Sequence, residues 1–413
     1  MSVWERTSKD VLGHIAAWEW EAVHVVDQVS SGQRPDLLDI SGFDAWNAAQ
    51  NAAWRERTME DVLAQSHASR AALTEAISRL DDRYLESPEA FPYGEGSLRQ
   101  FLDWQHDRHH AADLEAWRLG LKNPASPQEA GLLLGAHMSI AGGVSKSLER
   151  GHSIGCQSIQ IFTRNQRQWN SKPLDSEEIE RFKLNQAETG MGPVVAHDSY
   201  LINLGSPNDA MWEKSLAAYI LELQHCQTLS IPYLVMHPGS HVGSGEQAGL
   251  QRVAEGLDLA HDATQGFQVI SLLETTAGQG TNLGYRFEQL AAIRSMVREP
   301  ERVAICLDTC HVFAAGYELR TPESYAETLD DFDRILGLDS LRCLHLNDCK
   351  KELGSHVDRH EHIGKGMLGI EPFRFLMNDP RLAGLPGLLE TPKGPEMLED
   401  VENLRVLRSL VSG

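Results

Sequence analysis

Short apolar segments recur along the chain from about residue 131, and most of them stop at a residue type that can bind a metal ion. Seven such segments are "LLLGAH", "GPVVAH", "YLVMH", "VISLLE", "VAICLD", "RCLHLN" and "GLLE". An eighth, "SIQIFT" at residues 158–163, ends without a ligand type. Apolar runs of this length between polar or glycine-containing segments predict eight buried β-strands.

The polar ends of these strands follow one another at regular intervals. From His197 onward the shortest step is 34 residues, between Glu274 and Asp308. The longest is 45 residues, between His345 and Glu390. Amphipathic segments such as "WEKSLAAYILELQHCQTL" lie in between, so each interval fits one strand, one helix and two loops. Eight such units predict an α/β protein with a (β/α)₈ TIM barrel, in which the strand ends share one face and one pocket.

The chain is longer than a barrel requires. Its 413 residues exceed the roughly 250 of a typical TIM barrel, so we expect a second domain. Residues 1–118 show helical periodicity without a strand pattern, which predicts a small all-α bundle. Residues 119–131, "LGLKNPASPQEAG", contain two prolines and small polar residues and indicate a linker to a barrel at 132–413.

Composition points to the cytoplasm. The first residues, "MSVWERTSKD", are polar, and the sequence contains no run of 18 apolar residues, so we expect no membrane partner. The six cysteines form no paired CxxC pattern, which suits reduced thiols in a cytosolic enzyme. Cys306 and Cys343 fall within predicted strands, where burial explains them.

Further metal-ligand types lie beyond the strand ends. In "LNDCKKELGSHVDRHEHIGKG", Asp358 and His360 sit between glycines. Histidine, aspartate and glutamate without thiolate suit zinc or manganese in a catalytic site. One ion needs three or four protein ligands and about nine are available, so the pattern favours two or three ions held together. Carboxylate-bridged ions suit phosphoryl chemistry.

Nine motifs of the second part resemble the endonuclease IV family of abasic-site endonucleases. They are "GAHMSIAGG", "FTRNQRQW", "HDSYLINLG", "HPGSH", "ETTAGQGTNLG", "LDTCHVFAAGY", "HLNDCK", "VDRHEHIGKG" and "LLETP". The resemblance runs from about Leu132 to the C-terminus and implies a deoxyribonuclease IV-type phosphodiester hydrolase of base excision repair. Such an enzyme cleaves 5′ of an abasic deoxyribose, leaves a 3′-hydroxyl and a 5′-deoxyribose phosphate, and trims blocked 3′ ends.

The resemblance also implies a site of three Zn²⁺ ions. The implied ligands are His197, His237 and bridging Glu274 for the first ion; Glu274, Asp308, His345 and Glu390 for the second; and His311, Asp358 and His360 for the third. Glu274 and Glu390 are the implied catalytic residues. His137 matches a family position near the site, where a pocket role and core packing stay open. For His241 and His362 we expect supporting or surface roles rather than metal contact.

The implied partner is double-stranded DNA that contains an abasic site, bound by a monomer. By resemblance, Arg167, Tyr200 and Leu201 enter the duplex at the lesion. An abasic nucleotide has lost its stacking, so extruding it costs less than extruding an intact one. An aromatic and an aliphatic side chain can fill the gap while arginine contacts the groove. Without the resemblance, a packed loop and a solvated cation would explain these residues.

Charge and fold leave a rival interpretation open. The net charge is −22, and the part from residue 131 carries 25 basic and 37 acidic residues, or −12, where DNA binding favours a basic surface. Three zinc ions would add six positive charges at the pocket. Sugar isomerases and epimerases of related barrels hold one or two ions at the same strand ends. Two features favour the endonuclease. One is the trio His311, Asp358 and His360, and the other is the set of residues that enter the duplex, called the wedge residues below: Arg167, Tyr200 and Leu201. A non-catalytic scaffold would leave buried ligand types unpaired.

The first part of the chain resembles a different family. "DVLGHIAAWEWEAV" and "FLDWQHDRHHAADLEAWR" are similar to the DinB-like helical bundles, and the pattern with Trp18 and Trp46 is closest to the ClbS/DfsB branch. His14, His106 and His110 would form a three-histidine metal site, although core tryptophans and solvated histidines explain the same residues.

The role of this N-terminal part has two interpretations. The bundle family has a helix before "DVLGHI", so either the start codon lies upstream or the bundle is incomplete. The resemblance implies protection against DNA-alkylating genotoxins. A role in solubility or in an oligomer contact is the alternative, and the 12 basic and 22 acidic residues before position 131 permit it.

Overall fold

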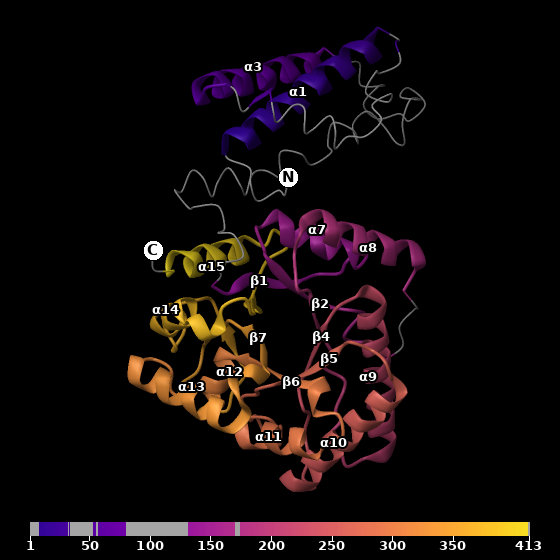
Figure 1. Cartoon of the computed structure of the whole chain (residues 1–413), viewed down its shortest axis with the longest axis vertical. Helices are drawn as coiled ribbons and strands as arrows, with labels where there is room; N and C mark the ends of the chain where they lie inside the picture. The colour runs from indigo at the N-terminus through magenta and orange to yellow at the C-terminus, as the bar shows by residue number, and fades with distance from the viewer. Residues whose placement is uncertain are drawn as a thin grey trace. The chain divides into compact units, whose positions relative to one another are not determined.

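Eight parallel strands close into a barrel, so the predicted (β/α)₈ TIM-barrel fold is confirmed (Figure 1). Neighbours around the barrel follow the order β1-β10-β7-β6-β5-β4-β3-β2. The strands are β1 (Leu133–Met138), β2 (Ser158–Phe162), β3 (Val195–His197), β4 (Tyr233–Met236), β5 (Ile270–Glu274), β6 (Val303–Asp308), β7 (Leu341–His345) and β10 (Pro386–Leu389). A separate antiparallel pair consists of β8 (Asp348–Cys349) and β9 (His360–Glu361).

The computed structural model describes residues 8–31, 33, 53–54, 57–79, 131–169 and 174–411. The chain divides into two units, Met1–Gln128 and Glu129–Gly413. The predicted domain boundaries at 118 and 131 stay predictions, because residues 80–130 lie outside the described part.

Burial on both faces explains why the barrel strands are apolar almost throughout. All six residues of β6, "VAICLD", are buried, as expected for a parallel strand with the barrel interior on one side and helices on the other. A separate cluster of buried side chains comes from six neighbouring strands, β3 to β7 and β10: Val195, Val235, Leu272, Ala304, Cys306, Cys343 and Leu388. The strand register then aligns the polar ends, since Asp308 pairs with His345 and Phe162 pairs with His197.

Helices surround the barrel (Figure 1). They are α7 (Ser145–Ser153), α8 (Ser176–Thr189), α9 (Asp209–Leu229), α10 (Glu246–Ala263), α11 (Phe287–Met296), α12 (Thr309–Ala315), α13 (Pro322–Leu336), α14 (Glu371–Asn378) and α15 (Leu398–Ser409), with short 3₁₀ turns at Pro300–Arg302, Leu338–Ser340 and Pro380–Leu382. Helix α12 matters most for the site. Its N-cap is Asp308, whose side chain accepts a hydrogen bond from the backbone N–H of His311 at 2.7 Å.

The described residues of the first unit contain two long helices, α1 (Ser8–Ser30) and α3 (Met59–Ser78), which pack against each other. Their shared core contains Ala16, Ala17 and Val62. Buried Glu19 of α1 accepts a hydrogen bond from Ser69 Oγ at 2.5 Å and pairs with Arg70, both on α3. Two amphipathic helices agree with the helical pattern of the sequence.

The predicted three-histidine site of this unit stays a prediction. His14 is buried in α1, and Trp18 beside it is buried as well. His106, His110 and Trp46 lie outside the described residues.

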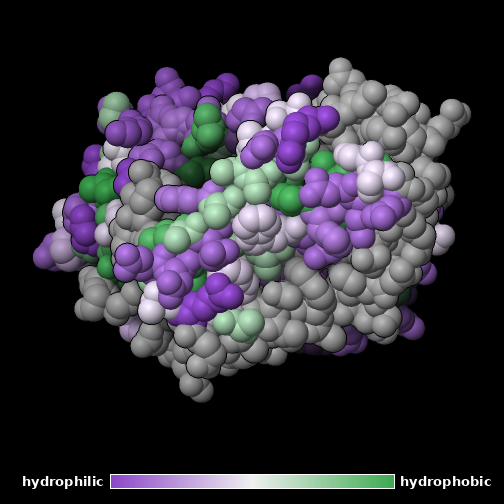
Figure 2. Space-filling model, turned by 90° about the horizontal axis from the view of Figure 1, so that it is seen from above, coloured by the Kyte–Doolittle hydropathy of each residue, from purple (hydrophilic) through white to green (hydrophobic). Residues whose placement is uncertain are grey.

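The described helices do not meet the requirements of a membrane span. None of the described helices is both long enough and apolar enough to cross a bilayer. On the face drawn in Figure 2, hydrophilic residues cover much of the described surface, and hydrophobic residues form a band across it.

Candidate metal centre

Nine predicted ligands converge at the C-terminal ends of the barrel strands. Six stand at or directly after a strand end: His197 (β3), His237 (β4), Glu274 (β5), Asp308 (β6), His345 (β7) and Glu390 (β10). His311 comes from α12, His360 from β9, and Asp358 from the segment before β9. Within each of three groups, one ligand atom per residue lies within 4.8 Å of the others: His197, His237 and Glu274; Glu274, Asp308, His345 and Glu390; and Asp308, His311 and His360.

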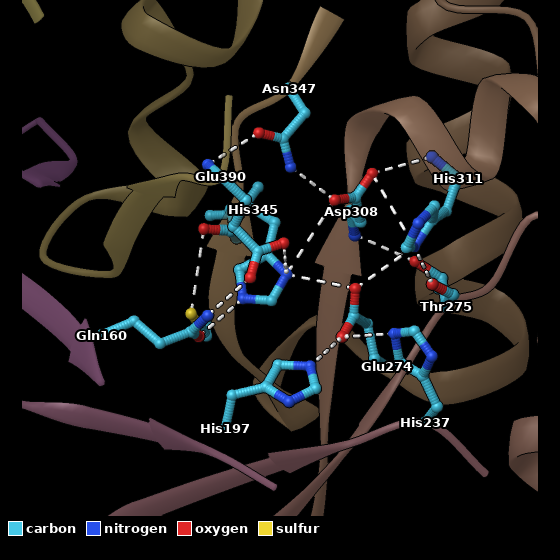
Figure 3. A network of polar contacts seen from close by, with 12 residues as sticks. Gln160, His197, His237, Glu274, Thr275, Asp308, His311, His345, Asn347 and Glu390 are labelled. Atoms are coloured by element: carbon cyan, nitrogen blue, oxygen red, sulfur yellow. Dashed lines mark hydrogen bonds and ion pairs between the residues drawn. The ribbon is translucent and has the colours of Figure 1, made fainter. Parts of the chain in front are cut away.

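The carboxylate of Glu274 lies at the centre of this arrangement (Figure 3). Its Oε2 is 3.1 Å from His197 Nε2 and 3.2 Å from His237 Nε2. Its Oε1 is 3.1 Å from His345 Nδ1 and 3.2 Å from His311 Nδ1. The side chain is fully buried, at 0% exposure. Each oxygen therefore faces two imidazoles, which is the geometry of a bridging carboxylate.

The deepest histidines use one ring nitrogen to hold the ring in place. His197 Nδ1 donates to the carbonyl of Asp198 at 2.8 Å, and His345 Nε2 donates to Gln160 Oε1 at 2.8 Å. In each neutral ring the second nitrogen then carries a lone pair. That nitrogen of His345 faces Glu274 at 3.1 Å and Glu390 Oε2 at 3.2 Å. A lone pair that faces carboxylate oxygens requires a cation, either a proton or a metal ion.

His311 and His360 repeat the pattern on the other side of Asp308. His311 Nδ1 donates to the carbonyl of Thr275 at 2.8 Å, and His360 Nδ1 to that of Glu390 at 3.3 Å. Both Nε2 atoms are buried without a hydrogen-bond partner. His311 Nε2 is 3.3 Å from Asp358, and His360 Nε2 is 3.5 Å from Asp308. Metal-binding histidines characteristically donate their other N–H to a carbonyl or carboxylate, so these residues fit a metal ion.

The pKa values of the ligand residues indicate that the centre stabilises bound positive charge. Burial alone would raise the pKa of Glu274, but the imidazoles of His345 and His237 hold that pKa well below its usual range. Burial opposes protonation of His345, yet Glu390 and Glu274 hold its pKa well above the usual value. Burial also opposes protonation of His311, but Asp308 holds the pKa of His311 well above its usual value. Metal ions bound between these groups would replace the protons.

Asp358 is the most open of the ligand types. Its carboxylate oxygens lie 3.3 Å from His311 Nε2 and 3.4 Å from His360 Nε2, and its side chain is 42% exposed. Burial opposes ionisation, but His311 lowers the pKa of Asp358 to about 2. The third group whose ligand atoms all lie within 4.8 Å of one another consists of Asp308, His311 and His360. Asp358 approaches the two histidines of this group from the solvent side.

A further grouping lies inside the barrel. Cys306 and Cys343 approach His345 closely enough to offer a ligand set. Burial raises the pKa of the Cys306 thiol well above its usual value, which disfavours the thiolate that a metal needs. Both cysteines belong to the apolar interior, as expected from their strand positions.

Several supporting residues escaped the sequence analysis. Gln160 in β2 joins two ligands, because its amide nitrogen donates to Glu390 Oε1 at 2.6 Å while its oxygen accepts from His345. Asn347 Nδ2 donates to Asp308 Oδ2 at 2.6 Å, and its oxygen accepts from the backbone of Glu390 at 2.8 Å. The available signal was a polar residue within an apolar strand, as in "SIQIF".

The other histidines named from the sequence lie around this centre. His137 Nδ1 accepts from Gln160 Nε2 at 2.9 Å and lies 3.7 Å from Glu390, so it lies beside the ligand Glu390. His241 Nδ1 accepts from the backbone of Gly243 and Gly245, and His362 accepts from a side chain of α15. The last two residues hold loops.

The proposed wedge residues lie on loops that leave this same barrel face. Tyr200 is 63% exposed, and its ring centroid lies 5.6 Å from that of His197. Arg167 is exposed on the loop after β2, and Leu201 is partly buried. An exposed aromatic ring beside a buried polar centre is available to a ligand.

Comparisons with known proteins define the class. The family model described as xylose isomerase-like TIM barrel matches residues 148–410. The "Probable endonuclease 4" of Chloroflexus aurantiacus is 57% identical over 279 residues, covering 68% of this chain and 98% of that protein. The counterpart of Geobacter sulfurreducens is 52% identical over 278 residues, covering 67% and 94%. Endonuclease IV from Thermus thermophilus matches in structure with a TM-score of 0.60 and 39% identity, covering 67% and 98%.

The fold, the site and these relatives together define a TIM-barrel hydrolase with a candidate metal centre. The chain belongs to the endonuclease IV family, which makes it an AP endonuclease of DNA repair. A D-tagatose 3-epimerase-like protein shares the fold at 16% identity and a TM-score of 0.53.

We predict that Gln160→Leu weakens metal binding without unfolding the barrel. The substitution removes the hydrogen bonds that orient His345 and Glu390, and losses of supporting partners typically cost about 10- to 100-fold in metal affinity. Competition between the protein and a chelator for Zn²⁺ measures the effect. Gln224→Leu, at an exposed position of α9, is the matched control. Equal affinity of the two variants would contradict the assigned role.

Proposed function

We propose that this protein is a zinc-dependent endonuclease that hydrolyses the phosphodiester 5′ of abasic sites in double-stranded DNA and also trims blocked 3′ ends. It acts as a cytoplasmic monomer. The observation that carries the proposal is the buried Glu274 carboxylate, which faces two imidazoles with each oxygen and belongs to two ligand groups at once. The similarity to endonucleases named above supports DNA as the substrate class.

Three Zn²⁺ ions fit the donor set, which contains imidazoles and carboxylates without thiolates. The first would be held by His197, His237 and Glu274; the second by Glu274, Asp308, His345 and Glu390; and the third by His311, Asp358 and His360. When bound, zinc activates water at neutral pH and stabilises charge on the phosphate and the leaving oxygen.

The exposure of the ligands indicates where the substrate phosphate enters. His345 and Glu274 are at 0% exposure, whereas the side chains of His237 and Asp358 are 29% and 42% exposed. The phosphate therefore approaches between His237 and Asp358. Glu274 and Glu390 hold the inner side, and Glu274 fixes the separation of the groups that share it.

The lesion is recognised next to this opening. The Tyr200 ring centroid lies 6.3 Å from that of His237, so an aromatic surface borders the entrance of the phosphate. With Leu201 it can occupy the space left by an extruded abasic nucleotide, while Arg167 contacts the groove. The carboxylates and the net charge of −22 make binding depend on the metal ions and on low salt.

The alternative of a sugar isomerase or epimerase is less well supported. Its barrel relatives share this fold at low identity, which does not determine chemistry. Two observations favour the endonuclease: a third ligand group at His311 and His360, and the exposed Tyr200 at the rim. A pocket for a small sugar requires neither.

We predict that Glu274→Gln abolishes cleavage of a duplex with one abasic site while the protein stays folded. Losing the shared charge uncouples two ligand groups, and the expected fall in kcat is on the order of 10³-fold or more. Gel-based cleavage assays, with and without chelator, and circular dichroism are the measurements. Glu288→Gln on α11 is exposed and serves as the control. Full activity in chelator-treated protein without detectable zinc would exclude the zinc mechanism.

We predict that the double variant Tyr200→Ala, Leu201→Ala binds abasic duplex about 10- to 100-fold more weakly, because the loss of one aromatic stacking contact of this kind costs about 1–3 kcal/mol. Zinc content and hydrolysis of a small phosphodiester stay unchanged. Leu184→Ala removes another exposed apolar side chain and is the control. An equal loss on the small substrate would show that the two residues support the site instead.

For the N-terminal unit we propose protection against DNA-alkylating genotoxins. The observation is its presence beside a repair nuclease, since the match to the Chloroflexus aurantiacus protein takes in 98% of that protein but 68% of this chain. Alkylated purines are lost readily and leave abasic sites, so both activities would oppose one threat.

We predict that residues 131–413 alone cleave abasic duplex like the full chain but protect repair-deficient cells less well from a cyclopropane-type alkylator. Cleavage in vitro and survival at matched expression are compared for the two forms. Identical survival would remove the case for a protective activity.

A further inference from the structure

The loop that carries Arg167 is held by a buried arginine. Arg164 follows β2 and is 5% exposed. Its Nη1 donates to the carbonyls of Gln168 and Trp169 at 2.8 and 3.0 Å, so one guanidinium nitrogen closes the loop around Arg167. The carbonyl contacts fix the backbone on the C-terminal side of Arg167.

Helix α9 anchors this guanidinium. Arg164 Nε donates to Glu222 Oε1 at 2.7 Å, and the Glu222 side chain is 1% exposed. Glu222 also accepts a hydrogen bond from Thr163 Oγ1. Burial raises the pKa of Glu222, and the charge of Arg164 opposes that rise. A buried ion pair is weak evidence of stabilisation, so the role that its contacts indicate is to hold the loop after β2 against α9.

A second contact ties this loop to the loop of the wedge. Ser199 is 1% exposed, and its Oγ donates to the carbonyl of Gln166 at 2.7 Å. Ser199 directly precedes Tyr200, and Gln166 directly precedes Arg167. Arg167 and Tyr200, two of the three residues proposed to contact DNA, are therefore each one position from the hydrogen bond that joins their loops.

We propose that Arg164 and Ser199 are positioning residues that preorganise Arg167 and Tyr200 for the damaged duplex. The inference rests on the proposed function, because it takes these two side chains as DNA contacts. Loops that are ordered before binding avoid the entropy cost of ordering them on DNA, so the gain appears in affinity. The metal ligands are not involved, so the chemical step is unaffected.

Two sets of changes test the proposal. Ser199→Ala removes the contact between the loops, together with the hydrogen bond that Ser199 Oγ accepts from the backbone N–H of Leu201 at 3.3 Å. The double variant Arg164→Met, Glu222→Met removes both buried charges together, which avoids leaving one unpaired. Arg298→Met is the control, since this exposed arginine also pairs with two carboxylates, those of Asp258 and Asp262.

The first readout is binding and turnover on an abasic duplex. We expect KM and Kd to rise about 5- to 10-fold in both loop variants, as for the loss of one or two hydrogen bonds, with kcat, zinc content and hydrolysis of bis(p-nitrophenyl) phosphate unchanged. In an Arg167→Ala, Tyr200→Ala background, the additional rise should disappear, because the positioned side chains are gone. The same rise in that background, or in the Arg298→Met control, would overturn the proposal.

Hydrogen exchange provides a readout that does not depend on DNA. In the free protein, amides of residues 165–169 and 199–201 should exchange at least several-fold faster in both variants than in the wild type. Unchanged exchange overturns the positioning role even if binding falls. If exchange rises while the wild type shows no preference for abasic duplex, Arg164 and Ser199 do order the two loops, but the proposed function is wrong.

Discussion

Glu274 is buried at the end of β5, and its two oxygens lie within 3.2 Å of four histidine nitrogens. Moving an ionised carboxylate from water into the protein interior costs several kcal/mol unless groups of opposite charge surround it. The barrel satisfies this requirement by bringing histidines from β3, β4, α12 and β7 to one point. The remaining carboxylates around those histidines add negative charge, which either protons or the proposed metal ions would balance.

The architecture of the barrel makes such convergence accessible to a linear sequence. Parallel strands in register place their last residues on one level, as the pairing of Asp308 with His345 shows. Asp308 has two roles there, because Oδ1 caps α12 through the backbone of His311 while Oδ2 faces the centre. Helix α12 begins at this candidate metal ligand, so the N-cap of the helix and the site both depend on the carboxyl group of Asp308.

The sequence was sufficient for the barrel and for the residues at the strand ends. An apolar run that stops at histidine or a carboxylate is visible without coordinates, and barrel topology tells where such ends meet. Gln160 was not found, because a polar residue in the middle of an apolar strand gives no sign of what it faces. Asn347 was hidden for a similar reason, since its contacts with Asp308 and Glu390 depend on three separate segments.

The loops show the limit of sequence reasoning more clearly. The sequence singled out Arg167 and Tyr200 by resemblance, but the contacts that hold them come from Arg164 and Ser199, whose roles depend on carbonyl positions. The grouping of Asp308 with His311 and His360, rather than Asp358 alone, likewise depends on distances across the centre.

The central claim is that one carboxylate organises a centre of three metal ions. X-ray diffraction from crystals of the purified protein, recorded on both sides of the zinc absorption edge, tests it directly. The account predicts three anomalous peaks at the ends of β3 to β10, two of them in contact with Glu274. A single peak, or peaks that do not contact Glu274, would contradict it.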